Sequence, residues 1–178
     1  SEMCIRDSVD RGRRARPGRR ARPDRLADAL AVVHAAGRLH CDLKPGNVLV
    51  DRDGQIHVCD FGLVADVGDR CDLGTPWFMA PEQVGLAPLS AATDWYAVGA
   101  LLFELYAGRP PFVGDAAEVR ARKCAEPAPP IATVVAAVPP VIADLIDGLL
   151  ARAAADRPDG AAVRVVARAL GGRDVTGP

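Results

Sequence analysis

The sequence predicts an α+β domain that is mainly helical and carries one short β-hairpin. Residues 95–105 form an almost uninterrupted apolar run, which is typical of a buried central helix. Leu26, Leu30 and Val33 are spaced to share one face of an earlier helix. Between these helices, two short β-rich runs at 48–50 and 56–59 flank an Asp-Gly pair, which indicates a hairpin.

Composition fits one globular domain. The chain has 178 residues, of which 49% are hydrophobic and 25% charged, and its formal net charge is −1. This charge favours neither a nucleic-acid nor a membrane partner overall. No apolar run reaches the roughly eighteen residues of a membrane-spanning helix, so we expect a cytoplasmic location, with an anchor outside this sequence left open. The five cysteines are scattered without a C-x-x-C pair and are predicted to be reduced thiols without zinc.

Residues 1–23 differ from the rest of the chain. The pentapeptide R-R-A-R-P occurs twice, at 13–17 and 19–23, and no apolar periodicity accompanies it. One interpretation is a basic tail for nucleic acid or an anionic membrane. The other, which we favour, is a disordered linker or a segment foreign to the natural protein, and no nucleic-acid partner is expected.

The remaining helices follow from start and stop signals. Asp24 is placed to cap the first helix and Gly37 to end it. Ser90 or Thr93 is placed to cap the apolar central helix, which Gly108 follows. Three further helices are expected at 115–125, 139–151 and 159–170, with a proline-interrupted loop at 126–138 and a tail at 173–178.

One motif carries most of the chemistry. The pattern H-x-D-x-K-x-x-N at residues 40–47 provides a carboxylate at Asp42, an ammonium at Lys44 and an amide at Asn47. A carboxylate can accept a proton from a hydroxyl, an ammonium can meet a phosphate, and an amide oxygen can bind a metal. Asp60, the first residue of a D-F-G triplet, offers a second oxygen ligand of the kind that Mg²⁺ prefers.

Together with the triplet A-P-E at 80–82, these motifs resemble those of the eukaryotic-like (Hanks-type) serine/threonine protein kinases. The resemblance implies a protein-kinase-like α+β fold, ATP and Mg²⁺ as cofactors, and phosphoryl transfer to Ser/Thr hydroxyls of proteins. It covers residues 24–172, which match the mainly α-helical C-lobe. Before residue 24 the sequence shows no Gly-rich loop and no strand with a phosphate-binding Lys. We therefore expect the N-lobe to be absent from this chain and to be its missing partner.

The resemblance also assigns roles around the nucleotide. Asp42 is the expected catalytic base, and Lys44 is expected to steady the γ-phosphate. Asn47 and Asp60 are the expected magnesium ligands. Leu49 matches the position that packs beneath the adenine ring, where an ordinary core leucine is the alternative interpretation.

Further positions match residues of the family that shape the site. Thr75 is expected to line the acceptor-substrate site, and with Lys44 it resembles the Ser/Thr-specific branch. The resemblance also implies three structural features: a histidine packed against the D-F-G phenylalanine, an aspartate that anchors the backbone of the catalytic loop at 40–47, and an internal ion pair. They fall at His40 with Phe61, at Asp94, and at Glu82 with Arg157.

Two departures from the commonest family pattern occur together. Cys41 stands where most members carry an Arg that pairs with an activation-loop phosphate. Residues 63–73 contain no Ser, Thr or Tyr that could carry that phosphate. We therefore predict an enzyme of the non-RD type that activation-loop phosphorylation does not switch.

Two other classes of function stay open at this point. One is a catalytically inactive kinase-like lobe that serves as a binding scaffold, which magnesium-dependent nucleotide binding would argue against. The other is a small-molecule phosphotransferase, which Thr75 and the A-P-E triplet argue against because that segment builds a peptide platform.

Overall fold

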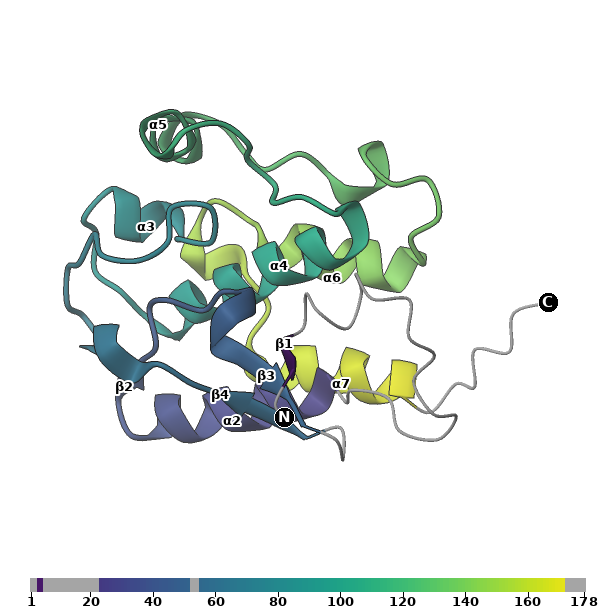
Figure 1. The fold of residues 1–178 in the computed structure, drawn as a ribbon, viewed down its shortest axis with the longest axis horizontal. Coiled ribbons are helices and arrows are strands. Elements are labelled where there is room, and N and C mark those ends of the chain that lie inside the picture. The colour runs from purple at the N-terminus through teal and green to yellow at the C-terminus, as the bar shows by residue number, and fades with distance from the viewer. Residues whose placement is uncertain (1–2, 5–22, 52–54, 172–178) are drawn as a thin grey trace.

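Six helices and five short strands make up the part of the chain that the computed structural model describes, residues 3–4, 23–51 and 55–171 (Figure 1). The helices are α2 (Pro23–Ala35), α3 (Pro81–Val84), α4 (Ala91–Ala107), α5 (Ala116–Ala125), α6 (Pro140–Leu149) and α7 (Gly160–Gly171). The strands are β1 (Met3–Cys4), β2 (Arg38–Leu39), β3 (Val48–Val50), β4 (Ile56–Val58) and β5 (Ala65–Asp66). Four 3-10 turns connect them: η1 (Pro45–Asn47), η2 (Phe61–Leu63), η3 (Ile131–Thr133) and η4 (Ala154–Asp156).

Helix α4 is the central helix that the apolar run predicted. Most of its side chains are buried, including Trp95, Tyr96 and Phe103. It packs along α6 in the middle of the molecule (Figure 1). Gly99 permits this close approach, because a Cβ added there would lie 2.8 Å from Cβ of Leu149.

Helix α2 packs against α7 and against β4, so the start and the end of the described helical region lie side by side (Figure 1). The helix begins at Pro23, whose fixed φ suits the first turn. Asp24 therefore lies inside the first turn, and the prediction that it caps the helix is wrong. Gly37 has a φ of +72°, the left-handed conformation expected two residues after the helix.

The predicted hairpin is present as the antiparallel pair β3–β4, with Val48 opposite Val58 and Val50 opposite Ile56. Its turn, residues 52–54, lies outside the described residues. Two pairings were not predicted: β1 pairs with β3, and β2 pairs with β5. Most of the basic segment at 1–23 lies outside the described residues.

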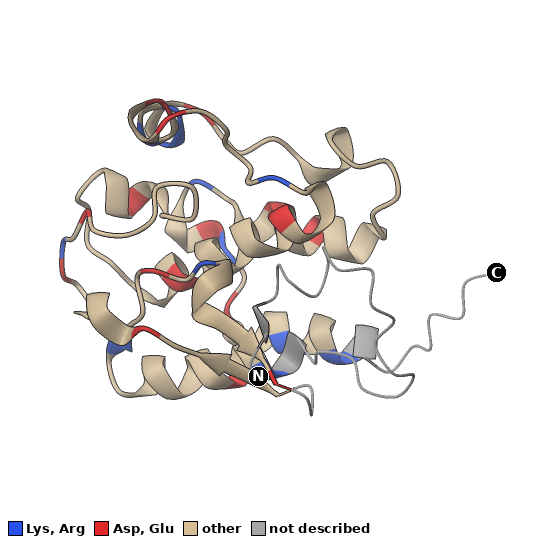
Figure 2. Ribbon diagram, in the orientation of Figure 1, with Lys and Arg blue, Asp and Glu red and all other residues tan. Residues whose placement is uncertain are grey.

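The three later helices lie where the sequence predicted them, at α5, α6 and α7. The proline-rich connection between α5 and α6 contains the short turn η3, which was predicted to be loop. Basic and acidic positions are interspersed over the described ribbon (Figure 2). No helix in the described part of the chain is long and apolar enough to span a membrane.

Candidate active site

The loop between β2 and η1 is fixed by a carboxylate from α4. Asp94, 1% exposed, accepts hydrogen bonds from the backbone N–H of His40 to Oδ2 and of Cys41 to Oδ1, both at 2.9 Å. Its position in the first turn of α4 suits a negative charge. Nε2 of His34 lies 2.8 Å from the same Oδ2. One buried carboxylate thus joins α2, α4 and the loop.

Asp42 lies at the centre of the candidate site, with its carboxylate 8% exposed. Lys44 places Nζ 2.6 Å from Oδ2 of Asp42. On the other oxygen, Oδ1, Asp42 accepts hydrogen bonds from the backbone N–H of Thr75 at 2.9 Å and from its Oγ1–H at 2.8 Å. These contacts fix the plane of the carboxylate, so the structure brings the three sequence-predicted residues together.

Asn47 directly precedes β3 and Asp60 follows β4, so both lie at the open end of the hairpin. The N–H of Cys59 donates to the carbonyl of Asn47 at 2.9 Å across this end. Nδ2 of Asn47 donates to the carbonyl of Asp42 at 2.9 Å, which fixes the orientation of the amide. Its oxygen Oδ1 accepts no hydrogen bond from the described residues and is free to bind a ligand. Asp60 is exposed in the left-handed conformation with a φ of 62°. An amide oxygen that accepts no such bond and an exposed carboxylate are ligands that fit Mg²⁺, which takes few protein ligands beside phosphate and water oxygens.

The rings of His40 and Phe61 lie in contact, with centroids 5.0 Å apart. Nε2 of His40 lies 3.0 Å from the carbonyl of Cys59, next to Asp60. Leu49 is half-buried in β3, opposite His57 of β4.

The segment 74–80 is held close to the loop at 40–44. Gly74 has a φ of +136°, and a Cβ there would lie 3.0 Å from the carbonyl of Cys41. Gln83, 1% exposed, donates from Nε2 to that same carbonyl at 2.9 Å and accepts from the N–H of Ala80 at 3.0 Å. Gln83 and His34 had no such role in the prediction, because neither belongs to a motif whose spacing reveals its partner.

Glu82 and Arg157 form a buried, two-contact ion pair, with Nη1–Oε1 at 2.6 Å and Nη2–Oε2 at 2.8 Å. Arg157 also donates to the carbonyls of Ala92, Ala151 and Arg152, so it joins α3, α4 and the α6–α7 connection. Burial by itself raises the pKa of Glu82, but the hydrogen bonds and charge of Arg157 outweigh it and lower that pKa below 4.5.

Replacing Arg157 with methionine is expected to lower the free energy of unfolding of the full-length protein by about 3–5 kcal/mol, because Glu82 is left buried without a cation. Urea unfolding measures this. The matched control is Arg122→Met, which removes an exposed i,i+4 pair with Glu126 and is expected to cost less than about 1 kcal/mol. Equal losses in the two variants would contradict the account.

The same pair predicts a dependence on pH. Because the pKa of Glu82 is lowered on folding, its stabilising contribution is complete above the ordinary pKa of 4.5 and is lost as the pH falls through the lowered value. In Glu82→Gln, the free energy of unfolding, measured by urea unfolding at a series of acidic pH values, should fall less steeply with decreasing pH than in the unmodified protein.

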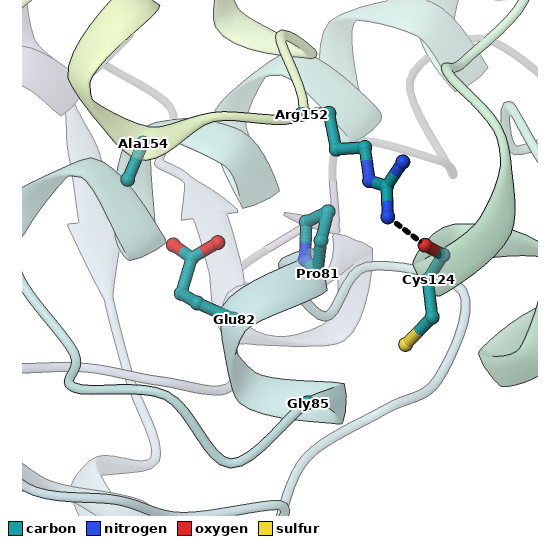
Figure 3. Close-up of a pocket in the computed structure, with 6 residues that line it drawn as sticks. All are labelled: Pro81, Glu82, Gly85, Cys124, Arg152 and Ala154. Carbon is teal, nitrogen blue, oxygen red and sulfur yellow. Dashed lines mark hydrogen bonds between the residues drawn. The ribbon is translucent and has the colours of Figure 1, made fainter.

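A pocket of about 340 Å³ opens beside this ion pair, between α3, α5 and the α6–α7 connection (Figure 3). Its lining residues are Pro81, Glu82, Gly85, Cys124, Arg152 and Ala154. Arg152 extends across it and donates to the carbonyl of Cys124. Of the predicted site residues, Glu82 lines this pocket, whereas Asp42, Lys44, Asn47, Asp60 and Thr75 do not.

The fold and site define a class. Residues 20–167 match the model of the protein kinase domain, so the chain belongs to the protein kinase family. The mainly helical fold with a short β-hairpin is that of the kinase C-lobe, and the predicted fold class is confirmed.

Characterised relatives include bacterial kinases. The chain is 41% identical over 155 residues to the DNA damage-responsive serine/threonine-protein kinase RqkA of Deinococcus radiodurans, covering 83% of this chain and 23% of that protein. It is 37% identical over 156 residues to the serine/threonine-protein kinase PknL of Mycobacterium tuberculosis, covering 84% of this chain and 39% of that protein. It is also 42% identical over 110 residues to the human cAMP-dependent protein kinase catalytic subunit PRKX, covering 60% of this chain and 30% of that protein. The chain therefore spans well under half the length of these relatives. The family match and these relatives confirm the predicted resemblance to Hanks-type serine/threonine kinases.

Proposed function

We propose that this chain is the C-lobe, residues 24–172, of a serine/threonine protein kinase that transfers the γ-phosphoryl group of Mg-ATP to Ser/Thr hydroxyls of proteins. The observation that carries the proposal is the carboxylate of Asp42, held by Thr75 on one oxygen and by Lys44 on the other. Its partners come from the catalytic loop and from the segment that leads into A-P-E, so one group joins the nucleotide side to the acceptor side.

Each residue then has a defined task. Asp42 orients the acceptor hydroxyl and accepts its proton. Lys44 swings its ammonium from Asp42 toward the γ-phosphate. Asn47 and Asp60 would hold Mg²⁺, which neutralises phosphate charge when bound. Thr75 keeps Asp42 in place and borders the position of the acceptor.

The adenine-binding part of the nucleotide site involves Leu49 and the N-lobe. Leu49, half-buried on β3, would support the adenine ring from below. The roof of the nucleotide site would come from an N-lobe that is not among the residues described. The two bacterial relatives named above carry the words serine/threonine-protein kinase, which supports this substrate class.

The test separates three classes of function. The full-length protein is incubated with Mg²⁺ and γ-labelled ATP, in turn with a generic protein acceptor, an aminoglycoside and choline. Label on Ser and Thr of the protein acceptor alone supports the proposal. Label on either small molecule identifies a small-molecule phosphotransferase. Absence of label together with absence of magnesium-dependent nucleotide binding identifies a scaffold.

We further propose that activity does not depend on a phosphate in the activation loop. Cys41 is 4% exposed, and burial together with the nearby carboxylate of Asp94 raises its pKa to about 12, so it stays an uncharged thiol. An uncharged thiol offers a phosphate no ion pair. Phosphatase treatment of the full-length protein is therefore expected to leave kcat within about twofold, a difference well under 1.4 kcal/mol. Residues 63–79 contain one hydroxyl side chain, that of Thr75. A stoichiometric phosphate found there, whose removal abolishes activity, would contradict the proposal.

A further inference from the structure

Helix α5 contacts the segment that flanks Thr75, at residues 72–79. It lies apart from the packed helices α4 and α6 in Figure 1 and packs against α3. Arg120 of α5 pairs with Asp72 at 2.8 Å, and its Nη1 lies 3.8 Å from Sδ of Met79. Contacts from one helix thus reach both sides of Gly74–Thr75.

The strongest of these contacts is made by a buried lysine. Lys123, 0% exposed, donates from Nζ to the carbonyl of Met79 at 2.6 Å and to that of Trp77 at 3.1 Å. The ammonium also lies over the rings of Tyr96 at 4.9 Å and Phe112 at 5.8 Å. It forms no ion pair with any carboxylate of the described residues. Because burying an unpaired ammonium is costly, two backbone carbonyls and two ring faces are its compensation.

The carbonyls that Lys123 binds belong to a turn that is hydrogen-bonded, through Thr75, to Asp42. The N–H groups of Phe78 and Met79 donate to the carbonyl of Thr75 at 2.9 and 3.1 Å. Thr75 in turn donates twice to Asp42. An unbroken series of hydrogen bonds therefore runs from α5 to the candidate base.

We propose that Lys123 is a positioning residue that holds the Trp77–Met79 turn, and through it Thr75, in the conformation that receives the acceptor peptide. The inference rests on the proposed kinase function. Residues 63–73 contain no Ser, Thr or Tyr to phosphorylate, and α5 supplies a cation that holds the segment after them from the other side.

The charge of this anchor depends on pH. Burial and the charge of Arg157 lower the pKa of Lys123 to about 7, while Glu82 opposes them. Tyr96 faces the ammonium as a neutral hydroxyl, because burial raises its pKa. Above pH 7 a growing fraction of Lys123 is therefore a neutral amine, which keeps two donors for the carbonyls of Trp77 and Met79 and no longer carries the cost of burying a charge.

The test replaces Lys123 with methionine in the full-length protein, which preserves length and removes both the charge and the donors. The KM for an acceptor peptide is expected to rise about tenfold, as the loss of two charge-assisted hydrogen bonds warrants, with the KM for ATP unchanged. Arg122→Met is the matched control, since it removes a cation from the same helix with no contact to the turn. A peptide KM in Lys123→Met that equals that of the control would overturn the proposal.

A second readout works without catalysis. Hydrogen exchange at the amides of Phe78 and Met79 is expected to become about tenfold faster in Lys123→Met than in Arg122→Met. Equal exchange would overturn the positioning role. If the unmodified protein transfers no phosphate, the proposed kinase function fails while this exchange measurement still decides the role of Lys123.

If Lys123→Met does not fold, the pH dependence of amide protection in the unmodified protein tests the role of Lys123. Protection of the Phe78 and Met79 amides, corrected for the chemical exchange rate, is expected to rise as the pH rises from about 6 to about 8, because opening the turn returns Lys123 to solvent, where its pKa is higher. Protection that stays constant over this range would overturn the proposal.

Discussion

Replacing Asp42 with asparagine is expected to lower kcat for protein phosphorylation by about 10²–10⁴-fold, the usual contribution of a positioned general base. Asparagine has the same shape, so the N–H and hydroxyl of Thr75 still find an oxygen at Oδ1. What is lost is the carboxylate that accepts the proton and attracts Lys44. Steady-state kinetics of the full-length variant with peptide and ATP measure the effect.

The control for this variant is Asp66→Asn. Asp66 is an exposed carboxylate on β5 that pairs with Arg38 at 2.5 Å, away from the contacts of Asp42. It is expected to leave kcat within about twofold, since exposed pairs contribute little. Nucleotide affinity should be unchanged in both variants. If Asp42→Asn retained the kcat of this control, Asp42 would not be the base.

Replacing Asp60 with alanine is expected to abolish transfer and to remove the magnesium dependence of nucleotide binding. Asp60 is exposed and has a left-handed backbone conformation that is uncommon for a non-glycine residue. Such conformations cluster at functional sites. With its carboxylate gone, Asn47 alone would remain to hold the ion. Calorimetric titration with an ATP analogue, with and without Mg²⁺, measures the change.

Asp144→Ala is the matched control for Asp60→Ala, because Asp144 is also exposed and lies on α6. It should bind nucleotide as the unmodified protein does. Transfer by Asp60→Ala at a rate near that of Asp144→Ala would refute the assignment of Asp60 as a metal ligand.

The sequence located the site more completely than it located the contacts that support it. The spacing of Asp42, Lys44 and Asn47 is local, so the motif named them, and the structure places them within hydrogen-bond distance. The long-range contacts of Asp94 and of Glu82 with Arg157 were named through the family resemblance. Periodicity alone would not have paired residues 75 positions apart.

Other features could not be predicted because they depend on tertiary packing. The β2–β5 pair has two residues on each strand, too few to show an alternating pattern. Lys123 lies on α5, whose sequence is rich in charged residues, yet it is completely buried against Tyr96 and the backbone of Trp77 and Met79. Likewise His34 belongs to an ordinary amphipathic helix, and only the position of α4 brings Asp94 within 2.8 Å.

The most direct measurement of the central claim is transfer of labelled γ-phosphate by the full-length protein to a protein acceptor, with Mg²⁺, in parallel with the Asp42→Asn variant. We expect label on Ser and Thr of the acceptor with the unmodified protein and a loss of at least about 10²-fold with the variant. Absence of label with the unmodified protein, or equal label with both, would contradict it.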